Sequence, residues 1–386
     1  MMPQNTQDIP PSPVSALEKV QEIEREKGIR VIRFDTAEPF FEPPQKAIDF
    51  TIDAIKNGKY KYSSSWGLRE LREKVAEYLS ETRQLEYSVD QVLITPGAKF
   101  ANFALFASHL RPHDKVLLIT PYWTSFKAVP SLLGIETVEV PSVYPFHLDE
   151  ERIKEAMSFR PKVIVINNPH NPTGGVMDLK DIQILEDLAE EYDFKILSDE
   201  IDWAYVYPGK RFISPASIGI LRDNTVVTDG FSKVFGLTGW RVGFSAGPKE
   251  SISIMHKIQE HSVSSPVTFA QYGCLGALDD YGAYIKGVLE TCSKNRQIAV
   301  SMLNEISQIR CDPPEGGFYV YPKLVSGPYG SSLKFAEDLL GKAGVSVMPG
   351  EYFGDNSGRF RLSYALPRDE LVEGIRRIAA FFEGLK

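Results

Sequence analysis

The sequence predicts an α/β protein with a large domain built on a mostly parallel sheet and a smaller α+β unit. Between about residues 45 and 275, short β-rich runs alternate with stretches that have helical apolar spacing. The runs are continuously apolar, which is typical of strands buried on both faces between helical crossovers. Beyond about residue 280 this alternation is replaced by a long helical stretch and short β-rich segments.

The individual elements follow from these patterns. Residues 1–13 are rich in proline, which fixes φ and removes amide donors, so an irregular arm is expected there. An amphipathic helix is expected over residues 14–28, ended by Gly28. Further helices are expected at residues 180–192, 249–261 and 294–307. The expected strands of the sheet are residues 92–95, 115–119, 136–140, 162–167, 194–199, 225–229 and 242–247.

Composition restricts the classes of partner. The 386 residues carry a net charge of −8, which gives no general attraction for nucleic acid or an anionic membrane. The N-terminus lacks an apolar signal core, and no apolar run approaches the length of a membrane helix. The three cysteines have no metal-ligand spacing, so we expect reduced thiols in a cytoplasmic protein without a metal site.

Polar motifs follow the expected strands at the points where the strands end. Parallel sheets bind ligands beyond the carboxyl ends of their strands, so these loops are expected to line one crevice. The motifs are PGAKF at residues 96–100, TPYW at 120–123, NNPHNPTGG at 167–175, a strand ending at Asp199, and GFSK at 230–233.

The motif at residues 167–175 is the most specific of these. Its prolines and glycines are also explained by a tight loop before a helix near Asp178, but such a loop does not require Asn171. The other motifs are weak when taken singly, and a lone Ser-Lys pair carries almost no information. A nucleotide-binding α/β protein is disfavoured, because no GxGxxG follows the first strand and no GxxxxGK[ST] occurs.

In this order, the motifs GAK, PYW, NNPHNPTG, SDE, FSKxxGLTGWRVG and FRLSYA resemble the class I/II aminotransferases, which are pyridoxal-phosphate (PLP) enzymes of fold type I. The resemblance covers nearly the whole chain. It implies a large PLP-binding domain at residues 46–280 and a small domain from residues 1–45 and 281–386. It also implies a homodimer with each active site at the subunit interface.

The resemblance implies the activity as well. An amino acid would transfer its amino group to the cofactor, and a 2-oxo acid would take it up in a ping-pong mechanism. A PLP-dependent lyase or synthase on the same scaffold is the alternative, because PLP supplies the electron sink in each reaction. A regulatory protein of this fold without turnover would not need Lys233.

The resemblance assigns the residues around the cofactor ring. Lys233 matches the lysine that holds PLP as a Schiff base and then moves the Cα proton. Asp199 matches the aspartate paired with the pyridinium nitrogen, and Asn171 matches the donor to the 3′-oxygen. Trp123 corresponds to the aromatic residue stacked on the ring, although a core or rim position is the commoner role for a single tryptophan.

The resemblance also assigns the anion-binding residues. Gly97, Ala98 and Lys99 would offer backbone amides to the phosphate at a helix N-terminus. Ser232 and Arg241 match further phosphate ligands, and Tyr62 matches a tyrosine that reaches the neighbouring subunit's phosphate, unless it is only a half-buried loop residue. These assignments complete the expected cofactor site.

The substrate carboxylate is assigned to one of two nearby arginines. Arg361 matches the arginine that clamps the substrate α-carboxylate, and it is preferred to Arg359 because it directly precedes LSYA. The two side chains would face the same side of a strand. The alternative is that one or both form surface ion pairs.

Three departures from the family pattern stand out. Asp202 occupies a position that is usually tyrosine. A carboxylate near the 3′-oxygen would keep the Schiff base protonated to a higher pH, with Tyr205 as a substitute donor, unless Asp202 points away as a helix polar group. Ala37 replaces a glycine near the substrate carboxylate, and His170 replaces a small residue. We expect His170 to be a solvated loop residue rather than a substrate contact.

The substrate side chain is the least determined feature. An acidic substrate would require a second cation, which the sequence does not place. Aromatic residues would suit an apolar side chain, unless they belong to the core or seal the domain interface. These residues are Phe40, Phe41, Trp66 and Phe126.

Overall fold

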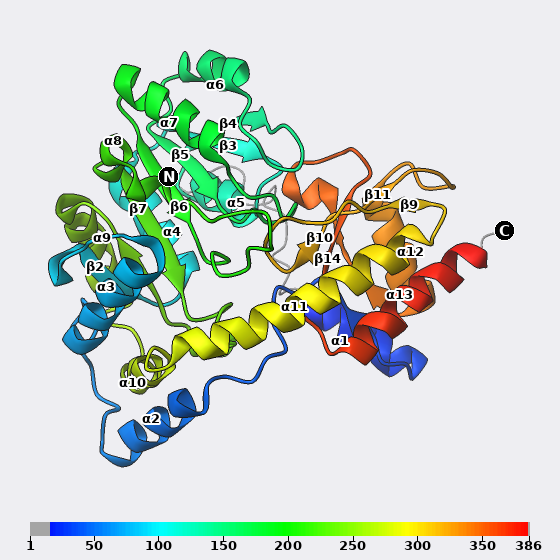
Figure 1. Cartoon of the computed structure of the whole chain (residues 1–386), viewed down its shortest axis with the longest axis horizontal. Helices are drawn as coiled ribbons and strands as arrows, with labels where there is room; N and C mark the ends of the chain where they lie inside the picture. The colour runs from blue at the N-terminus through cyan, green and yellow to red at the C-terminus, as the bar shows by residue number, and fades with distance from the viewer. Residues whose placement is uncertain (1–15, 385–386) are drawn as a thin grey trace.

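The computed structural model describes residues 16–384, and its largest element is a seven-stranded sheet (Figure 1). The strands lie in the order β2-β8-β7-β6-β5-β3-β4, and every neighbouring pair is parallel except those that β8 makes with β2 and β7. The predicted mostly parallel sheet is confirmed, and all seven expected runs form strands. Their bounds are β2 Val92–Thr95, β3 Lys115–Thr120, β4 Glu136–Pro141, β5 Val163–Asn167, β6 Lys195–Asp199, β7 Thr225–Gly230 and β8 Gly243–Ala246.

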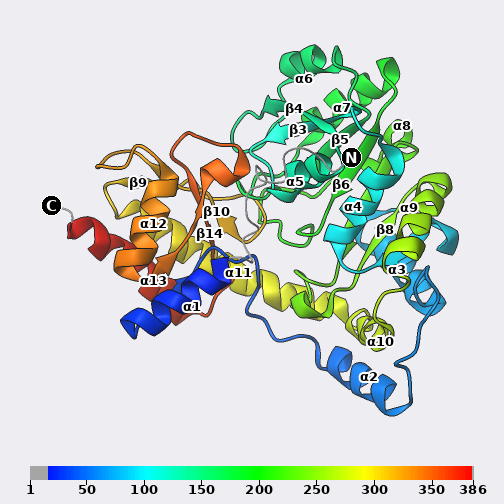
Figure 2. The same ribbon diagram turned by 180° about the vertical axis from the view of Figure 1, so that it is seen from behind.

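Helices cover both faces of this sheet (Figures 1 and 2), which explains the continuously apolar strands. In β5, Ile164 and Ile166 belong to a core cluster shared with α6 and α7, whereas Val163 and Val165 belong to a cluster shared with α4 and α9. Alternate strand residues therefore face two apolar layers, and neither face is left for polar residues. The covering helices include α4 Ala98–His109, α5 Ser125–Leu132, α6 Glu150–Met157, α7 Leu179–Glu191, α8 Gly219–Arg222 and α9 Lys249–Ser262.

Helix α2 (Gln45–Lys56) lies at the periphery and packs against α10 (Thr268–Ala277) (Figure 1). Glycine allows the close approach, because a Cβ atom on Gly276 would lie 2.4 Å from the carbonyl oxygen of Lys46. Helix α3 (Arg69–Arg83) packs nearby on α10 and β2. The outer face of α2 is left exposed.

The remaining elements come from both ends of the described chain. The expected N-terminal helix is confirmed as α1 (Ala16–Lys27) and ends at Gly28, which has a φ of +63°. The expected arm at residues 1–13 lies outside the described residues. Strand β1 (Ile32–Arg33) pairs in parallel with β12 (Val345–Ser346), and the long helix α11 (Tyr281–Asn304) runs from α10 towards these small sheets (Figure 1). The division into domains at residues 46 and 280 stays a prediction.

The other short strands form two further sheets, one with the order β10-β14-β13 and one that pairs β11 with β9. None of the helices between residues 16 and 384 combines the length and apolar character needed to cross a membrane. The bounds are β9 Ile309–Arg310, β10 Tyr319–Val320, β11 Lys323–Leu324, α12 Ser332–Ala343, β13 Met348–Pro349, β14 Phe360–Ser363 and α13 Arg368–Glu383.

Candidate active site

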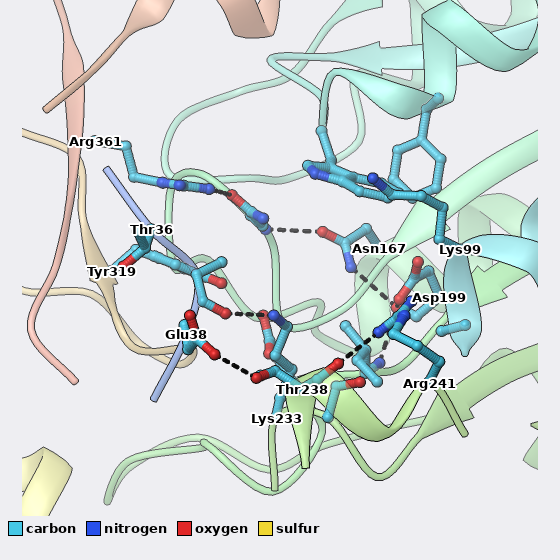
Figure 3. A pocket seen from close by; sticks show the side chains of 18 of the residues that line it. Thr36, Glu38, Lys99, Asn167, Asp199, Lys233, Thr238, Arg241, Tyr319 and Arg361 are labelled. Atoms are coloured by element: carbon cyan, nitrogen blue, oxygen red, sulfur yellow. Dashed lines mark hydrogen bonds between the residues drawn. The ribbon is translucent and has the colours of Figure 1, made fainter. Parts of the chain in front are cut away.

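A cavity of about 680 Å³ opens beyond the carboxyl ends of the parallel strands, where β14 and the segment after β1 close it (Figure 3). This position is the one expected for an open parallel sheet. Most of the predicted site residues line it, and they are Ala37, Ala98, Lys99, Trp123, Asn171, Asp199, Ser232, Lys233, Arg241 and Arg361.

The register of β5 and β6 fixes one wall of the cavity. Asn167 and Asp199 are the last residues of the two strands and lie opposite each other. The Asn167 side chain donates to the Asp199 carbonyl (3.1 Å) and accepts from the Asn171 backbone N–H (2.8 Å). The loop after β5 is therefore folded back over its own strand, which brings Asn171 to the cavity. Asn167 lines the cavity too, although the sequence analysis did not single it out.

Asp199 is held by a neighbour that the sequence analysis missed. Its Oδ2 accepts a hydrogen bond from the Asn102 amide at 2.8 Å, and the Asn102 carbonyl accepts from the Thr228 hydroxyl at 2.7 Å. Burial raises the pKa of Asp199 to about 6, and the Asn102 hydrogen bond opposes this rise. The available signal for Asn102 was a polar residue in the middle of helix α4, where residues 100–101 and 103–107 are all apolar.

Lys233 follows β7 directly and faces the cavity. Its Nζ donates to the carbonyl oxygen of Ala37, and its own carbonyl accepts from the Tyr205 hydroxyl at 2.8 Å. Burial lowers the pKa of Lys233 because the ammonium form loses hydration, while the Asp202 carboxylate acts in the opposite direction. A lysine with a lowered pKa has more of the neutral amine that attacks a carbonyl carbon.

The N-terminus of α4 and Arg241 form an anion site on another side of the cavity. Gly97 precedes α4 with a φ of +84°, and a Cβ atom on it would lie 2.5 Å from Nη2 of Arg241. Glycine therefore lets the guanidinium lie against the helix end. Arg241 also donates to the Thr238 carbonyl at 2.8 Å, which fixes its direction. Backbone N–H groups and a guanidinium together favour a phosphate group.

Arg361 approaches from β14 and is 1% exposed. Its guanidinium donates to Oδ1 of Asn171 at 2.8 Å and to the carbonyl of Asp35 at 2.7 Å, while its Nε has no partner among residues 16–384. No carboxylate in the described part of the chain forms an ion pair with it. Its charge is therefore available for a ligand carboxylate.

Comparisons with known proteins agree with this geometry. Residues 29–378 match the family model described as aminotransferase class I and II. The chain belongs to the class I and II aminotransferase family. A relative from Aquifex aeolicus, whose name reads "Probable aspartate/prephenate aminotransferase", is 37% identical over 97% of this chain and 96% of its own.

Two solved structures resemble this aminotransferase closely. The aspartate aminotransferase of Thermus thermophilus with maleate has a TM-score of 0.90 and is 34% identical, covering 97% of both chains. The aromatic aminotransferase of Pyrococcus horikoshii has a TM-score of 0.87 and is 31% identical, covering 97% of this chain and 99% of its own. The enzyme therefore has fold type I, depends on PLP and moves amino groups between amino acids and 2-oxo acids.

The cavity of this aminotransferase fits PLP. It offers an amine to the aldehyde, a carboxylate to the ring nitrogen and an anion site to the phosphate, in Lys233, Asp199 and Arg241. Buried Oδ1 of Asp202 and Nε of Arg361 lack hydrogen-bond partners among the described residues, as expected for atoms that face a ligand. When bound, PLP supplies an electron sink for charge that develops at the substrate Cα.

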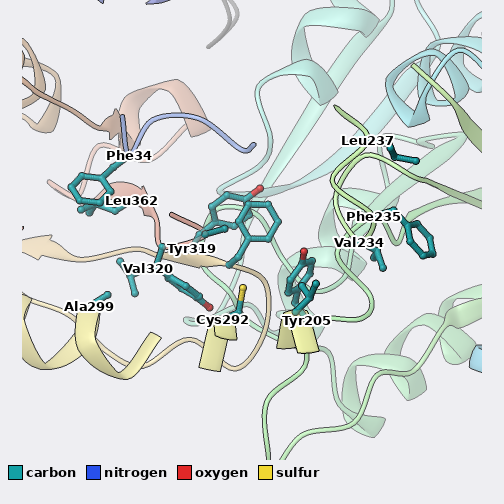
Figure 4. Close-up of a cluster of buried hydrophobic side chains, with 14 of the residues drawn as sticks. Phe34, Tyr205, Val234, Phe235, Leu237, Cys292, Ala299, Tyr319, Val320 and Leu362 are labelled. Carbon is teal, nitrogen blue, oxygen red and sulfur yellow. The ribbon is translucent and has the colours of Figure 1, made fainter. Parts of the chain in front are cut away.

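The structure corrects three expectations about the positions that depart from the family pattern and their neighbours. Asp202 is 1% exposed and lines the cavity, so the alternative in which it points away is wrong. The hydroxyl of Tyr205 is committed to the Lys233 carbonyl inside the core (Figure 4), so Tyr205 does not replace the missing donor. His170 is not solvated, because it is 2% exposed and stacks on Phe146 with ring centroids 3.5 Å apart.

The aromatic candidates separate into two groups. Trp123 and Phe126 line the cavity in an edge-to-face pair with centroids 5.3 Å apart. Trp66 instead stacks on His256 at 4.1 Å, and neither it nor the contacting pair Phe40 and Phe41 lines the cavity. Only the first pair can contact a substrate in this arrangement.

Other positions differ from, or add to, the expected set. Arg359 lies outside the cavity, donates to the Tyr321 carbonyl at 3.0 Å and makes no ion pair among the described residues, so the surface ion-pair alternative is wrong for both arginines. Tyr62 is 88% exposed and also lies outside the cavity. The sequence analysis assigned no role to seven further cavity residues, which are Arg33, Thr36, Glu38, Ile201, Thr238, Gly239 and Tyr319.

Proposed function

We propose that this aminotransferase takes an acidic amino acid, aspartate in particular, as its amino donor. The observation that carries the proposal is a second uncompensated cation on the cavity wall. Lys99 lies with its Nζ 5.0 Å from the centroid of the Trp123 ring, and no carboxylate of residues 16–384 lies within ion-pair distance of it. Arg33 also lines the cavity, but Asp35 already binds its guanidinium at 2.6 and 3.1 Å.

In this proposal each residue has one task. Arg361 binds the α-carboxylate and Lys99 binds the side-chain carboxylate, so the Cα–H bond is oriented towards Lys233. Lys233 holds the cofactor covalently and, once released, moves the Cα proton. Asp199 keeps the ring nitrogen protonated, and Asn171 donates to the 3′-oxygen. The phosphate is bound by Arg241, Ser232 and the backbone of residues 97–99, which leaves the Lys99 side chain for substrate.

The test is a comparison of donors in wild type and Lys99→Gln, each loaded with PLP. We expect kcat/KM for aspartate to fall about 100-fold in the variant, because a charge-assisted contact worth about 2–3 kcal/mol is lost. The value for alanine should change little. Equal losses for both donors would assign Lys99 to the cofactor instead. A wild type that prefers phenylalanine would favour an aromatic donor, which Trp123 and Phe126 would accommodate.

We also propose that two copies of the chain form the working enzyme. Helix α2 exposes three apolar side chains, Phe50, Ile52 and Ile55, which are each more than 40% exposed, and Tyr60 and Tyr62 follow them. An apolar face of this kind is typical of a subunit interface. A second copy seated on it would bring Tyr62 towards the partner's phosphate site. Light scattering should therefore give twice the chain mass, and Tyr62→Phe should weaken PLP binding without changing that mass.

A cytoplasmic location belongs to the same proposal. The cysteines at positions 274, 292 and 311 are all free and buried, which suits a reducing compartment. Fractionation of source cells is the direct test, and recovery outside the cytoplasmic fraction would overturn this part.

A further inference from the structure

His170 lies where three loops of the seven-stranded sheet meet. Its own loop follows β5, and β3 and β4 are the next two strands in the sheet order. The ring is 2% exposed and stacks on Phe146, in the loop after β4, with an angle of 9° between the ring planes. It also borders a small hollow with Tyr122, in the loop after β3, and with Phe126 and Asn167 of the cavity wall. A side chain at this point can therefore act on all three loops.

The two ring nitrogens of His170 have partners in different loops. Nδ1 lies 2.8 Å from the Thr173 hydroxyl, whose oxygen also accepts from the Gly175 backbone N–H at 3.1 Å. The ring forms a further hydrogen bond to the backbone carbonyl of Pro121, in the loop after β3. Because Nδ1 faces Thr173, this second bond belongs to Nε2.

These partners determine where the ring proton of His170 lies. A carbonyl oxygen can only accept, so Nε2 carries the proton and donates to Pro121. Burial lowers the pKa of His170 to about 3, so the ring holds a single proton at neutral pH and Nδ1 accepts from the Thr173 hydroxyl. The ring therefore donates to one loop and accepts within the other.

The two loops that His170 joins carry residues of the cofactor site. Trp123 lies two residues after Pro121, and Asn171 follows His170 directly. Oδ1 of Asn171 accepts from Arg361 at 2.8 Å, so the amide nitrogen of Asn171 is the group left to donate into the cavity. The position of each loop therefore decides where a cofactor contact lies.

The sheet itself does not fix the spacing of these two loops. The ladder between β3 and β5 ends at Leu118 and Val165, before either strand ends. We propose that His170 is a positioning residue whose ring bridges this gap and sets the distance between Trp123 and Asn171 on the cavity wall. The bridge needs neither cofactor nor substrate, and only its effect on the cofactor rests on the proposed role of Asn171 as donor to the 3′-oxygen.

Two substitutions separate the bridge from simple packing. His170→Phe keeps a ring on Phe146 and loses both hydrogen bonds. His170→Gln loses the ring, but Nε2 of glutamine is the same number of bonds from Cα as Nε2 of histidine, so a donor for the Pro121 carbonyl is kept. A side chain that only filled space would be replaced better by phenylalanine, whereas a bridge would be replaced better by glutamine.

The first experiment is a pH titration of the visible absorbance band of the PLP-loaded enzyme. A hydrogen bond donated to the 3′-oxygen draws negative charge away from the nitrogen that joins Lys233 to the cofactor, so that nitrogen loses its proton at a lower pH. We expect the midpoint to rise by about half a pH unit or more in His170→Phe, where Asn171 is displaced, and to stay near the wild-type value in His170→Gln. An unchanged midpoint in His170→Phe, or a larger shift in His170→Gln, would overturn the proposal.

The second experiment reads the bridge in the full-length protein without cofactor. Nitrogen-15 NMR of the histidine rings identifies the protonated nitrogen of each ring, and the His170 signal is the one missing from His170→Gln. We expect a proton on Nε2 and no titration between about pH 5 and pH 9. A proton on Nδ1, or titration in this range, would overturn the bridge even if aspartate proves to be a substrate. His170→Asn, whose amide reaches only the Nδ1 position, replaces His170→Phe if circular dichroism shows that the phenylalanine variant does not fold.

Discussion

The amide nitrogen of Asn102 lies 2.8 Å from Oδ2 of Asp199, and both groups are buried. Asn102 is itself fixed by the Thr228 hydroxyl, so helix α4, strand β6 and strand β7 converge on one carboxylate. The hydrogen bond favours the charged form of Asp199 against the effect of burial. A charged Asp199 is the form that can pair with a protonated ring nitrogen.

Asn102→Leu is therefore expected to weaken the cofactor site. Without the donated hydrogen bond the pKa of Asp199 rises further, and a hydrogen bond to a charged group is worth about 1.5–3 kcal/mol. We expect PLP to bind at least about tenfold more weakly, measured by fluorescence titration of the cofactor-free protein. Asn356→Ala, at an exposed position, is the control. Unchanged PLP affinity in Asn102→Leu would show that Asp199 needs no orienting partner.

Asp199→Asn should stabilise the cofactor-free protein although it removes activity. The pKa of Asp199 rises from 3.8 to about 6 on folding, so its charge opposes folding above that pH. This loss of stability is absent below pH 3.8, where Asp199 is protonated in both the folded and the unfolded chain. It increases between pH 3.8 and about pH 6, and it is complete above about pH 6. At about 1.4 kcal/mol per pKa unit it approaches about 3 kcal/mol.

Thermal unfolding of the cofactor-free protein measures this effect. Tm of Asp199→Asn should exceed that of wild type at pH 8, and the difference should shrink as the pH falls towards 4. A difference that is independent of pH would mean that packing, not charge, separates the two proteins.

Arg361→Lys should reduce substrate binding strongly. Lysine cannot reproduce the planar fork that Asn171 and Asp35 hold in place, so the two-point contact with the α-carboxylate is lost. We expect kcat/KM to fall about 100-fold for every amino acid, with PLP affinity retained. Arg359→Lys, two residues away and outside the cavity, should keep most of the activity. The reverse ranking of the two variants would assign the clamp to Arg359.

Gly97→Ala tests the contact between α4 and Arg241. The new Cβ would lie 2.5 Å from Nη2 of Arg241 and would adopt a φ of +84°, so the guanidinium must move away from the helix end. We expect PLP affinity to fall about tenfold or more, since one charge-assisted phosphate contact is displaced. Gly209→Ala is the control. Gly209 has a similar φ of +97°, but a Cβ atom added to it would have no atom within 4 Å, so this variant introduces the backbone strain without displacing Arg241.

The strands of the sheet and most of the cofactor-site residues were predictable, because each is marked by a short continuous stretch of sequence. A buried parallel strand needs a continuous apolar run, and the residues after it must lie at the same edge of the sheet, so Asn171, Asp199 and Lys233 could be brought together from spacing and the family pattern. The same argument does not reach Asn102, which points into the site from the second turn of a helix, or Glu38, which follows Ala37 in its loop and received no role from the sequence.

The buried environments were the other features that the sequence did not predict. His170 was expected to be a solvated loop residue, but the loop folds back over β5 and places the ring on Phe146. Tyr205 was one turn from Asp202 along the chain, yet its hydroxyl reaches the Lys233 backbone rather than the cavity. In each case the direction of a side chain depends on tertiary contacts that sequence spacing does not specify.

The most direct test of the proposed mechanism is a single half-reaction. The PLP-loaded enzyme is mixed with excess L-aspartate in the absence of any 2-oxo acid, and oxaloacetate, ammonia and the cofactor spectrum are followed together. An aspartate aminotransferase should release one equivalent of oxaloacetate per subunit, leave the cofactor in its amine form and produce no ammonia. Continuous release of ammonia or another product, with the cofactor unchanged, would contradict amino-group transfer.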